Sequence, residues 1–453
     1  MKKYLSALVV LVWMCVAQAA PRYVFLFIGD GMSTPQRMLA EEYARVTGMG
    51  ELAMNHLPFH ATTRTCSSSS LITDSAAAAT AIACGVKTYN GAIGVDPARK
   101  PVASVAECAH RAGRKVGIVT TCTINHATPA GFYAHRVNRG LSYQIGLDLV
   151  ASGFDYFAGG GFGAGKSDDK KDACYRGDLY DLARKAGYQV VRTRADLAAC
   201  RPGGKVLFSW GEIHIQQEID RREGDPSLAE LTAKGIELLD GPDGFFMMVE
   251  GGTIDWAGHS NDAATNLRET LDLDRAVRVA LDFQKRHPKE TLIVVTGDHE
   301  TGGMTMGFAK TGYTLYLKRL AGQKCSIGKF ASRLKAAQKA AARDKKPYTF
   351  DEAKKLLTDW FGFDFTKPAD RKAADDEIVL TADDVKELEK AFARGCLDKV
   401  AARITAEKAG ISWTSGAHTA LPVLTTAQGV GGETFVGFFE NTGIAARLKA
   451  FYP

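Results

Sequence analysis

The chain has 453 residues, of which 45% are hydrophobic and 24% are charged, and its formal net charge is +6. This composition is typical of a soluble globular protein with about two or three domains, or with one large domain that carries an insertion. The positive charge is small and dispersed, so it argues against binding to nucleic acid.

The N-terminus has the pattern of an export signal. A positively charged start is followed by an apolar stretch from Leu5 to Val16 and by the small-residue cleavage sequence Ala17-Gln18-Ala19. The apolar stretch is shorter than the roughly 20 residues that cross a bilayer, so no membrane anchor is expected. Residues 1–19 are therefore predicted to be a signal peptide for export to the periplasm or the medium, and residues 20–453 to form the mature domain.

Several short apolar runs, rich in Val, Ile and Phe, alternate with stretches of helical character. The runs cover Tyr23 to Ile28, Val116 to Thr121, Phe245 to Val249 and Leu292 to Thr296. Such runs are typical of strands that are buried on both faces in a parallel sheet. The pattern predicts an α/β fold with a large, mostly parallel central sheet that is covered by helices on both faces.

Each of these runs ends in a turn that carries polar side chains. The turns contain Asp30, His126 with Thr128, Glu250 with Asp255, and Asp298 with His299. Asp and Gly are common in turns, so any single turn of this kind would be unremarkable. Ligands of parallel sheets bind beyond the carboxyl ends of the strands. The coincidence therefore indicates a functional site at one edge of the sheet.

Ser75 stands at the start of an alanine-rich stretch that favours a helix. An isolated serine before a helix is most often an ordinary N-cap. A helix N-terminus also attracts anions, however, through its free N–H groups and its dipole. Ser75 is therefore also a candidate nucleophile toward phosphorus, provided that a metal or a base activates its hydroxyl.

Residues 160–167, with the sequence GGFGAGKS, fit the pattern of a nucleotide-binding P-loop and follow an apolar run from Phe154 to Ala158. A P-loop must open a helix, whereas the charged sequence from Asp168 to Asp172 is an uncertain helix start. The segment is therefore interpreted as a glycine-rich surface loop. An ATPase is the less favoured alternative, and it would require Lys166.

Several candidate metal ligands have suggestive spacings. Asp255 and His259 are four positions apart, so on a helix they share one face and suit zinc. A simple hydrogen bond between them is the common alternative. The adjacent residues Asp298 and His299 can reach one ion from a strand end, whereas His418 is a lone histidine, for which a structural role is the usual one.

Asp30 and Glu250 are hard oxygen donors that suit magnesium. Two zinc ions about 4 Å apart would make chemical sense of the remaining set. One ion would activate the hydroxyl of Ser75, and the other would stabilise the leaving oxygen and later activate water.

Residues 320–410 differ in composition from the rest of the chain. They are dense in Lys, Asp, Glu and Ala with helical spacing, for example from Phe330 to Ala342 and from Ala382 to Ala402. Their charged runs are typical of solvated helix faces. This segment is predicted to be a helical insertion or cap that precedes the last candidate ligand, His418.

The chain has nine cysteines. An oxidising compartment permits disulfides, and proximity in the sequence suggests Cys174 with Cys200 and Cys325 with Cys396. The sequence does not determine the connectivity.

At this point the motifs resemble those of alkaline phosphatases. The matching segments follow the family order from residue 23 to about residue 430: Phe27 to Ser33, Thr73 to Ala77, Gly85 to Thr88, His126 to Ala130, Val249 to Gly252, Gly297 to Gly303 and the surroundings of His418. The resemblance implies a sheet of about ten mostly parallel strands. It also implies hydrolysis of phosphate monoesters and suggests a homodimer.

The resemblance assigns a role to each candidate residue. Ser75 is the phosphorylated nucleophile, and Arg139 clamps the phosphate in the bidentate manner of arginine, although Arg136 is close enough to be confused with it. The implied metal ligands are Asp255, His259 and His418 for one zinc, Asp298 and His299 for the other, and Asp30 as a bridge to a magnesium that Glu250 and Thr128 also bind.

Two positions vary within the family. His126 stands where some members carry an Asp near the magnesium, so its contact to that site runs either directly or through water. Trp256 stands where some members carry a phosphate-binding Lys, so weaker retention of product phosphate is expected.

Related phosphodiesterases, sulfatases and phosphomutases are the main alternatives. The sulfatases use a modified Cys or Ser within a distinct flanking motif, whereas Ser75 is followed by alanines, and many phosphodiesterases use Thr at this position. A comparison of monoester and diester hydrolysis separates these activities. A non-catalytic metal- or phosphate-binding protein is a further alternative, which no feature of the sequence favours.

Overall fold

The structure is a computed structural model that describes residues 20–163, 174–366 and 374–452. The expected signal peptide, residues 1–19, lies outside the described residues, as does Lys166 of the P-loop-like segment. No helix in the described ranges is both long enough and apolar enough to cross a membrane.

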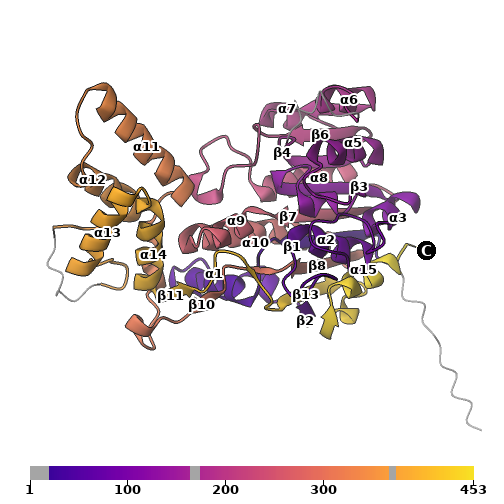
Figure 1. Cartoon of the computed structure of the whole chain (residues 1–453). Coiled ribbons are helices and arrows are strands. Elements are labelled where there is room, and N and C mark those ends of the chain that lie inside the picture. The colour runs from indigo at the N-terminus through magenta and orange to yellow at the C-terminus, as the bar shows by residue number, and fades with distance from the viewer. Residues whose placement is uncertain (1–19, 164–173, 367–373, 453) are drawn as a thin grey trace, which may run out of the picture.

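The core of the molecule is a ten-stranded sheet, in which every pairing is parallel except those of β13 (Figure 1). The strands, in spatial order, are β14 (Gly437–Glu440), β2 (Phe59–Arg64), β13 (Val423–Gly429), β8 (Thr291–Gly297), β1 (Tyr23–Gly29), β7 (Phe245–Gly251), β3 (Lys115–Thr123), β4 (Tyr156–Gly160), β6 (Lys205–Ser209) and β5 (Tyr188–Val191). The expected large and mostly parallel sheet is thus confirmed.

Helices pack on both faces of this sheet, because the side chains of each central strand alternate between two hydrophobic cores. Phe25 and Phe27 of β1 join the core that α1 (Thr34–Val46), α8 (Leu228–Leu239) and α10 (Ala263–Arg286) complete. The intervening residues, such as Leu26, face the second core. The helices that border the second core are α2 (Ser75–Cys84), α3 (Val105–Arg111), α5 (Ser142–Ser152), α6 (Leu179–Lys185) and α15 (Thr442–Lys449).

The four strands expected from the sequence are neighbours in the middle of the sheet, in the order β8, β1, β7 and β3. Their carboxyl ends are aligned, since Gly29 pairs with both Gly251 and Gly297. The turns that follow these strands therefore meet at one edge. Two short helices begin there, α4 (Ala127–Ala130) after β3 and α9 (Thr253–His259) after β7.

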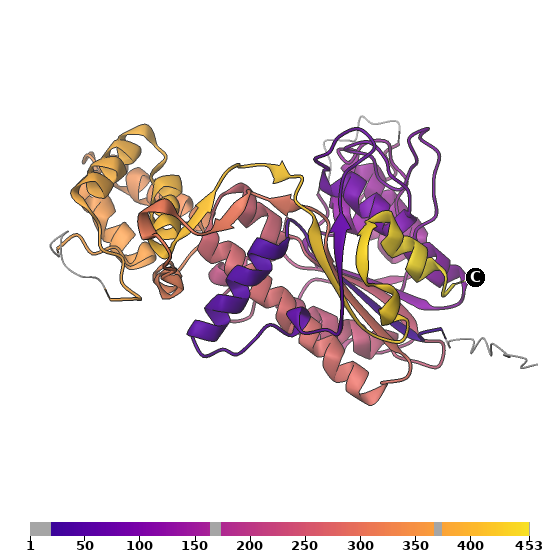
Figure 2. The same cartoon turned by 90° about the horizontal axis from the view of Figure 1, so that it is seen from below.

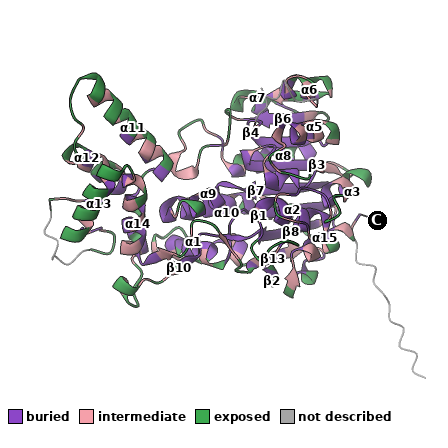
Figure 3. Ribbon diagram, viewed as in Figure 1, coloured by how far each residue is buried: buried purple, intermediate pink, exposed green. Residues whose placement is uncertain are grey.

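Residues 327–366 and 374–409 form a helical module at the side of the molecule, which is seen in orange in Figures 1 and 2. Its helices are α11 (Ile327–Arg343), α12 (Phe350–Phe361), α13 (Ala382–Arg394) and α14 (Leu397–Ala409). They share a hydrophobic cluster of their own, around Phe330, Leu357 and Leu388. The outward faces of α11 and α13 are exposed, as expected for charged helices (Figure 3).

The helical run from Ala382 to Ala402 is not continuous, which corrects the expectation from the sequence. Gly395 adopts a left-handed conformation with φ of 71° and ends α13. Its N–H donates to the carbonyl of Phe392, and α14 starts two residues later at Leu397. A glycine in this conformation is the common way to end a helix.

The helical module is fastened to the sheet domain at the start of α10. The carboxylate of Asp262 caps α10 and also accepts hydrogen bonds from Gln323 Nε2 (2.8 Å) and from the backbone N–H of Ile327 (3.0 Å). Two small antiparallel pairs also connect the parts, β10 (Met304–Met306) with β11 (Ile411–Trp413), and β9 (Glu300–Thr301) with β12 (His418–Thr419).

The suggested disulfides are not formed in the described part of the chain. Cys200, Cys325 and Cys396 all carry thiols, so neither Cys174 with Cys200 nor Cys325 with Cys396 is bridged. Proximity in sequence was a poor guide because the thiol of Cys325 is buried in the core of the helical module. Cys200 packs instead in the core below the sheet.

Candidate active site

Ser75 is the first residue of α2, but it is not the residue that caps the helix. The N-cap is Asp74, whose carboxylate accepts a hydrogen bond from the N–H of Ala77 at 3.0 Å. The Ser75 side chain is therefore available for another role, and the interpretation of Ser75 as an ordinary N-cap is wrong. Its Oγ is buried and lies 3.3 Å from Nε2 of His299.

A first group of donors lies beside this hydroxyl, at the ends of β1 and β8. Nε2 of His299 is 3.4 Å from Oδ1 of Asp30 and 3.2 Å from Oδ2 of Asp298. The backbone N–H groups of Gly31 and His299 donate to Oδ1 of Asp298 and so fix its orientation. Oδ1 of Asp30 and Oδ2 of Asp298 are buried and have no hydrogen-bond partner among the described residues.

A second group joins α9 to β12. Oδ2 of Asp255 is 3.4 Å from Nε2 of His259, and Oδ1 is 3.5 Å from Nε2 of His418. The other ring nitrogens of the two histidines are held by the carbonyls of Gly416 and Thr73, each at 2.8 Å. This arrangement directs both Nε2 atoms toward Asp255, which is how ligand histidines are usually oriented.

The short pairing of β12 with β9 brings the second group against the first. His418 pairs with Thr301, and the rings of His418 and His299 stack with their centroids 3.6 Å apart. The hydroxyl of Thr301 donates to Oδ1 of Asp255 at 2.5 Å. The lone histidine of the sequence is thus part of the cluster.

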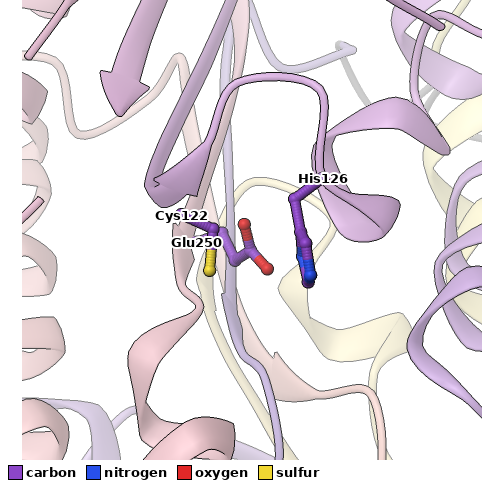
Figure 4. Close-up of side chains that lie close together, drawn as sticks. All are labelled: Cys122, His126 and Glu250. Atoms are coloured by element: carbon purple, nitrogen blue, oxygen red, sulfur yellow. The ribbon is translucent and has the colours of Figure 1, made fainter. Parts of the chain in front are cut away.

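A third group meets the other carboxylate oxygen of Asp30, Oδ2. Thr128 at the start of α4 donates from Oγ1 to Oδ2 of Asp30 at 3.3 Å, and Thr120 donates to Glu250. A ring nitrogen of His126 also lies near Glu250 (Figure 4). Oxygen donors dominate this side, in keeping with the expectation of magnesium.

The electrostatics of the site call for cations. Burial and the neighbouring carboxylates raise the pKa values of Asp30 and Asp298 well above their usual range. Burial raises the pKa of Glu250 to about 7, against the lowering effect of its hydrogen bonds. Three buried carboxyl groups that resist ionisation together are stable as carboxylates only if positive charge lies among them.

The imidazoles complete the electrostatic pattern. The hydrogen bond that the His259 ring donates to the carboxylate of Asp255 raises the pKa of His259 to about 9. Burial and the neighbouring His418 hold the pKa of His299 well below its usual range, so this ring is neutral. A neutral imidazole between carboxylates is a zinc ligand in its binding form. The residues present therefore fit two ions with mixed N and O donors and one ion with oxygen donors.

The two nearby arginines differ in their partners. Arg139 lies over the site, with Nη1 at 3.2 Å from Oδ2 of Asp74 and Nη2 at 3.3 Å from Nε2 of His126. Arg136 is held away by Asp148, which accepts hydrogen bonds from its Nε at 2.7 Å and its Nη2 at 2.5 Å. Arg139 is the guanidinium that lies beside the start of α2.

The structure adds supporting residues to which the sequence gave no role. Thr301 and Thr120 orient Asp255 and Glu250, and Asp74 both caps α2 and holds Arg139. Thr301 and Asp74 lie within the matching segments around Asp298 and Ser75, so their positions in the sequence could have indicated a supporting role. Thr120 lies inside a strand, and no feature of the sequence indicated its role.

With this geometry in view, the chain can be compared with known proteins. The family model of alkaline phosphatases matches residues 21–452. Alkaline phosphatase 3 of Bacillus subtilis is 34% identical over 388 residues, which cover 83% of this chain and 76% of that protein. The cold-active alkaline phosphatase of the psychrophile Shewanella sp. superposes with a TM-score of 0.80 at 29% identity, over 95% of this chain and all of that one.

A third comparison concerns the metals. A variant of the alkaline phosphatase of the Antarctic bacterium TAB5, with magnesium bound in its M3 site, superposes with a TM-score of 0.69 at 27% identity and covers 96% of this chain and 99% of that one. The central sheet, the buried donor groups and the similarity to known proteins all indicate a metal-dependent hydrolase. The chain belongs to the alkaline phosphatase family, and it is an enzyme that hydrolyses phosphoric monoesters.

Proposed function

We propose that the enzyme hydrolyses phosphate monoesters through a phosphoserine at Ser75. The observation that carries this proposal is the position of the Ser75 hydroxyl, which is buried at the start of α2 and lies 3.3 Å from Nε2 of His299. The Oγ–P bond forms as the bond from phosphorus to the alcohol oxygen breaks, and water later cleaves the Oγ–P bond to release phosphate. The positive N-terminal end of α2 stabilises the phosphoryl group in both steps.

Arg139 completes the phosphate site in this proposal. Its guanidinium offers two parallel N–H groups to the phosphoryl oxygens, and Asp74 holds it in place through Nη1. Because Asp74 also caps α2, one carboxylate sets the relative position of nucleophile and clamp.

The proposed metal ligands follow the three donor groups. Asp255, His259 and His418 would hold one zinc, and Asp298 and His299 would hold the second. Asp30, Glu250, Thr128 and His126 would hold a third ion, which the resemblance implies is magnesium. When bound, the ions supply Lewis acidity at the nucleophile and at the leaving oxygen and neutralise the buried carboxylates.

The test is replacement of Ser75 by Ala together with trapping of the intermediate. The parent enzyme should hydrolyse a phosphate monoester and, when quenched in acid, carry phosphate on Ser75 in peptide mass spectra. Ser75→Ala should lose both signals, whereas Lys166→Ala, which removes the P-loop-like lysine, should keep both. Persistent hydrolysis in Ser75→Ala, or phosphate on another residue, would contradict the proposal.

Two measurements separate this function from the alternatives. Hydrolysis of monoesters should exceed that of diesters, because the second ester group has no counterpart in a site built around one phosphoryl group. Metal analysis before and after chelation should show loss of zinc in step with loss of hydrolysis. Preferred cleavage of diesters would favour the phosphodiesterase alternative.

We infer that residues 1–19 direct export and are removed after Ala19, on the pattern of charge, apolar run and small residues. N-terminal sequencing of the secreted protein should begin at Ala20. The resemblance suggests a homodimer, and light scattering of the purified enzyme tests this by measuring its molar mass.

We propose that the helical module is the insertion expected at residues 320–410 and that it acts as a cap beside the site. A cavity of about 510 Å³ lies between the end of α9 and α14. It is lined by His259 and Asn261 on one side and by Lys399, Arg403 and Trp413 on the other. The module thus shapes the surface next to a proposed zinc ligand.

A further inference from the structure

Cys122 lies beside the oxygen donors of the third group, although neither the sequence analysis nor the proposed ligand set uses it. Its thiol projects from the end of β3 toward the carboxylate of Glu250, with the imidazole of His126 on the opposite side (Figure 4). A sulfur, a ring nitrogen and a carboxylate oxygen of these three residues lie within 4.8 Å of one another.

Buried atoms in this group have unused bonding capacity. Glu250 is fully buried, and its Oε1 has no hydrogen-bond partner within residues 20–163, 174–366 and 374–452. Nδ1 of His126 is likewise buried and has no hydrogen-bond partner among the described residues. A buried carboxylate oxygen without a partner is destabilising unless a cation binds it.

Gly252 lets the sulfur of Cys122 pack closely against the backbone beside this oxygen. A Cβ atom added to Gly252 would lie 2.5 Å from Sγ of Cys122 and 3.0 Å from Oε1 of Glu250. Gly252 has a φ of −75°, which any residue adopts, so its backbone does not require glycine. The missing side chain makes room for the sulfur beside this carboxylate oxygen.

The donor types identify the class of ion. Magnesium takes oxygen ligands and retains water, whereas a thiolate with imidazole and carboxylate suits zinc or cobalt. A reactive thiol is the other role of such a cysteine, but the side chain of Cys122 is fully buried, so reagents in solution do not reach the sulfur.

We propose that Cys122, His126 and Glu250 bind a thiophilic divalent ion, Zn²⁺ or its substitute Co²⁺, in preference to Mg²⁺ at the third metal position. The ion displaces the thiol proton, which passes to solvent, and a metal–sulfur bond forms with no change of oxidation state. The inference rests on the proposed third metal site but not on the phosphoserine at Ser75.

The test uses cobalt as a spectroscopic probe of the full-length mature enzyme. Chelated protein is titrated with Co²⁺, and a sulfur-to-cobalt charge-transfer band in the near ultraviolet is expected as the third equivalent binds. The band should be lost in Cys122→Ser and in Cys122→Ala. Cys84→Ser is the matched control, because Cys84 is an equally buried thiol on α2 outside the three donor groups, and it should keep the band.

An excess of Mg²⁺ should leave the band intact in the parent enzyme. Absence of the band in the parent, its persistence in both Cys122 variants, or its removal by Mg²⁺ would each overturn the inference. Hydrolysis of a monoester is measured on the same samples. An enzyme that forms phosphoserine at Ser75 but shows no band would refute the thiolate site and leave the proposed function standing.

Discussion

Arg139 and Arg136 are close neighbours in the sequence, yet their guanidinium groups pair with different carboxylates. Arg139 shares Asp74 with the start of α2, whereas Arg136 is bound twice by Asp148. Arg139→Ala should therefore lower kcat/KM by about 10²–10³-fold, which is the typical effect of removing one group that stabilises transition-state charge. Steady-state kinetics with a phosphate monoester provide the measurement.

Arg136→Ala is the matched control for this experiment. Its loss leaves a partly exposed carboxylate unpaired, which costs about 1 kcal/mol of stability at most. Its kcat/KM should stay close to that of the parent. Equal kinetic losses in the two variants would show that Arg139 does not hold the phosphate.

Trp256 on α9 stands where the resemblance places a phosphate-binding Lys in some relatives, so we expect it to affect product release. Its ring packs edge-on against His126 and His214, with centroids 6.1 and 4.9 Å apart. Trp256→Lys adds a positive charge near the phosphate, so inhibition by inorganic phosphate should become about tenfold stronger, equivalent to 1.4 kcal/mol. Trp256→Phe keeps the aromatic packing without the charge and should leave the inhibition constant unchanged. Unchanged or weaker inhibition in the Lys variant would refute the expectation.

At the residue scale, the sequence sufficed for charged side chains at strand ends but not for uncharged ones within an apolar strand. Asp30, Glu250 and Asp298 stand directly at strand ends, where a parallel sheet presents its functional groups. Cys122 and Thr120 lie within the apolar β3, where the sequence does not show which neighbour a side chain meets. That information depends on the pairing of β3 with β7, strands that are far apart in the chain.

At the scale of elements, Gly395 controls where α13 ends and α14 begins. Gly395→Ala should lower the free energy of unfolding by roughly 1–2 kcal/mol, because an L-residue is strained in the left-handed region. Its φ is 71° and an added Cβ would meet open space, so the penalty arises from the backbone alone. Chemical denaturation followed by circular dichroism measures the change.

Gly328 in the first turn of α11 is the matched control. Its helical position has a negative φ and its added Cβ would touch only Ser326, at 3.9 Å. Gly328→Ala should stabilise the protein by up to about 1 kcal/mol through helix propensity. A destabilisation of equal size in both variants would show that packing, and not backbone conformation, governs the effect.

The contact of α10 with the segment after η3 (Glu218–Asp220) depends on pH. Burial tends to raise the pKa of Asp272, but the hydrogen bonds and charge of Arg221, aided by Arg275, hold it below its usual value. An unfolded Asp titrates at about 3.9, so this stabilisation is complete above that pH and is lost as pH falls through the lower folded pKa.

Asp272→Asn tests this dependence. The variant should be less stable than the parent by about 3–5 kcal/mol at neutral pH, the usual effect of breaking a buried ion pair. The difference should shrink below pH of about 4, where the carboxyl group of the unfolded chain becomes protonated, and should vanish below the lower pKa of the folded parent. Denaturation curves between acidic and neutral pH measure it, and a difference that does not vary with pH would contradict the assignment.

Element prediction succeeded where the physical signal is local. The four expected strands coincide with β1, β3, β7 and β8 to within two residues at each end, since continuous β-branched and aromatic runs are a strong local signal. The spatial order β8, β1, β7, β3 could not be predicted from the sequence, because strand pairing joins segments that are far apart in the chain. The break at Gly395 was missed because charged helical spacing continues across it.

At the scale of the whole molecule, the metals are expected to stabilise the fold as well as the reaction. Chelation leaves Asp30, Glu250, Asp255 and Asp298 buried together with no divalent cation to balance them. An ion present at 100 times its dissociation constant contributes about 2.7 kcal/mol. Calorimetry should show a lower melting temperature after chelation and recovery when Zn²⁺ is restored.

Ser75→Ala separates this effect from catalysis. It lacks the proposed nucleophile but keeps every proposed ligand, so its melting temperature should respond to chelation as that of the parent does. A chelated protein that melts at the parent temperature would show that the carboxylates tolerate burial without ions.

The small β9–β12 pairing, which places His418 against His299, has a consequence for biosynthesis. The first proposed ligand emerges from the ribosome at Asp30 and the last only at His418. A nascent or truncated polypeptide that lacks His418 is therefore expected to be inactive, even when most of its sheet has formed. We therefore expect enzymatic activity to appear in a single step, late in synthesis, once the segment that carries His418 has folded.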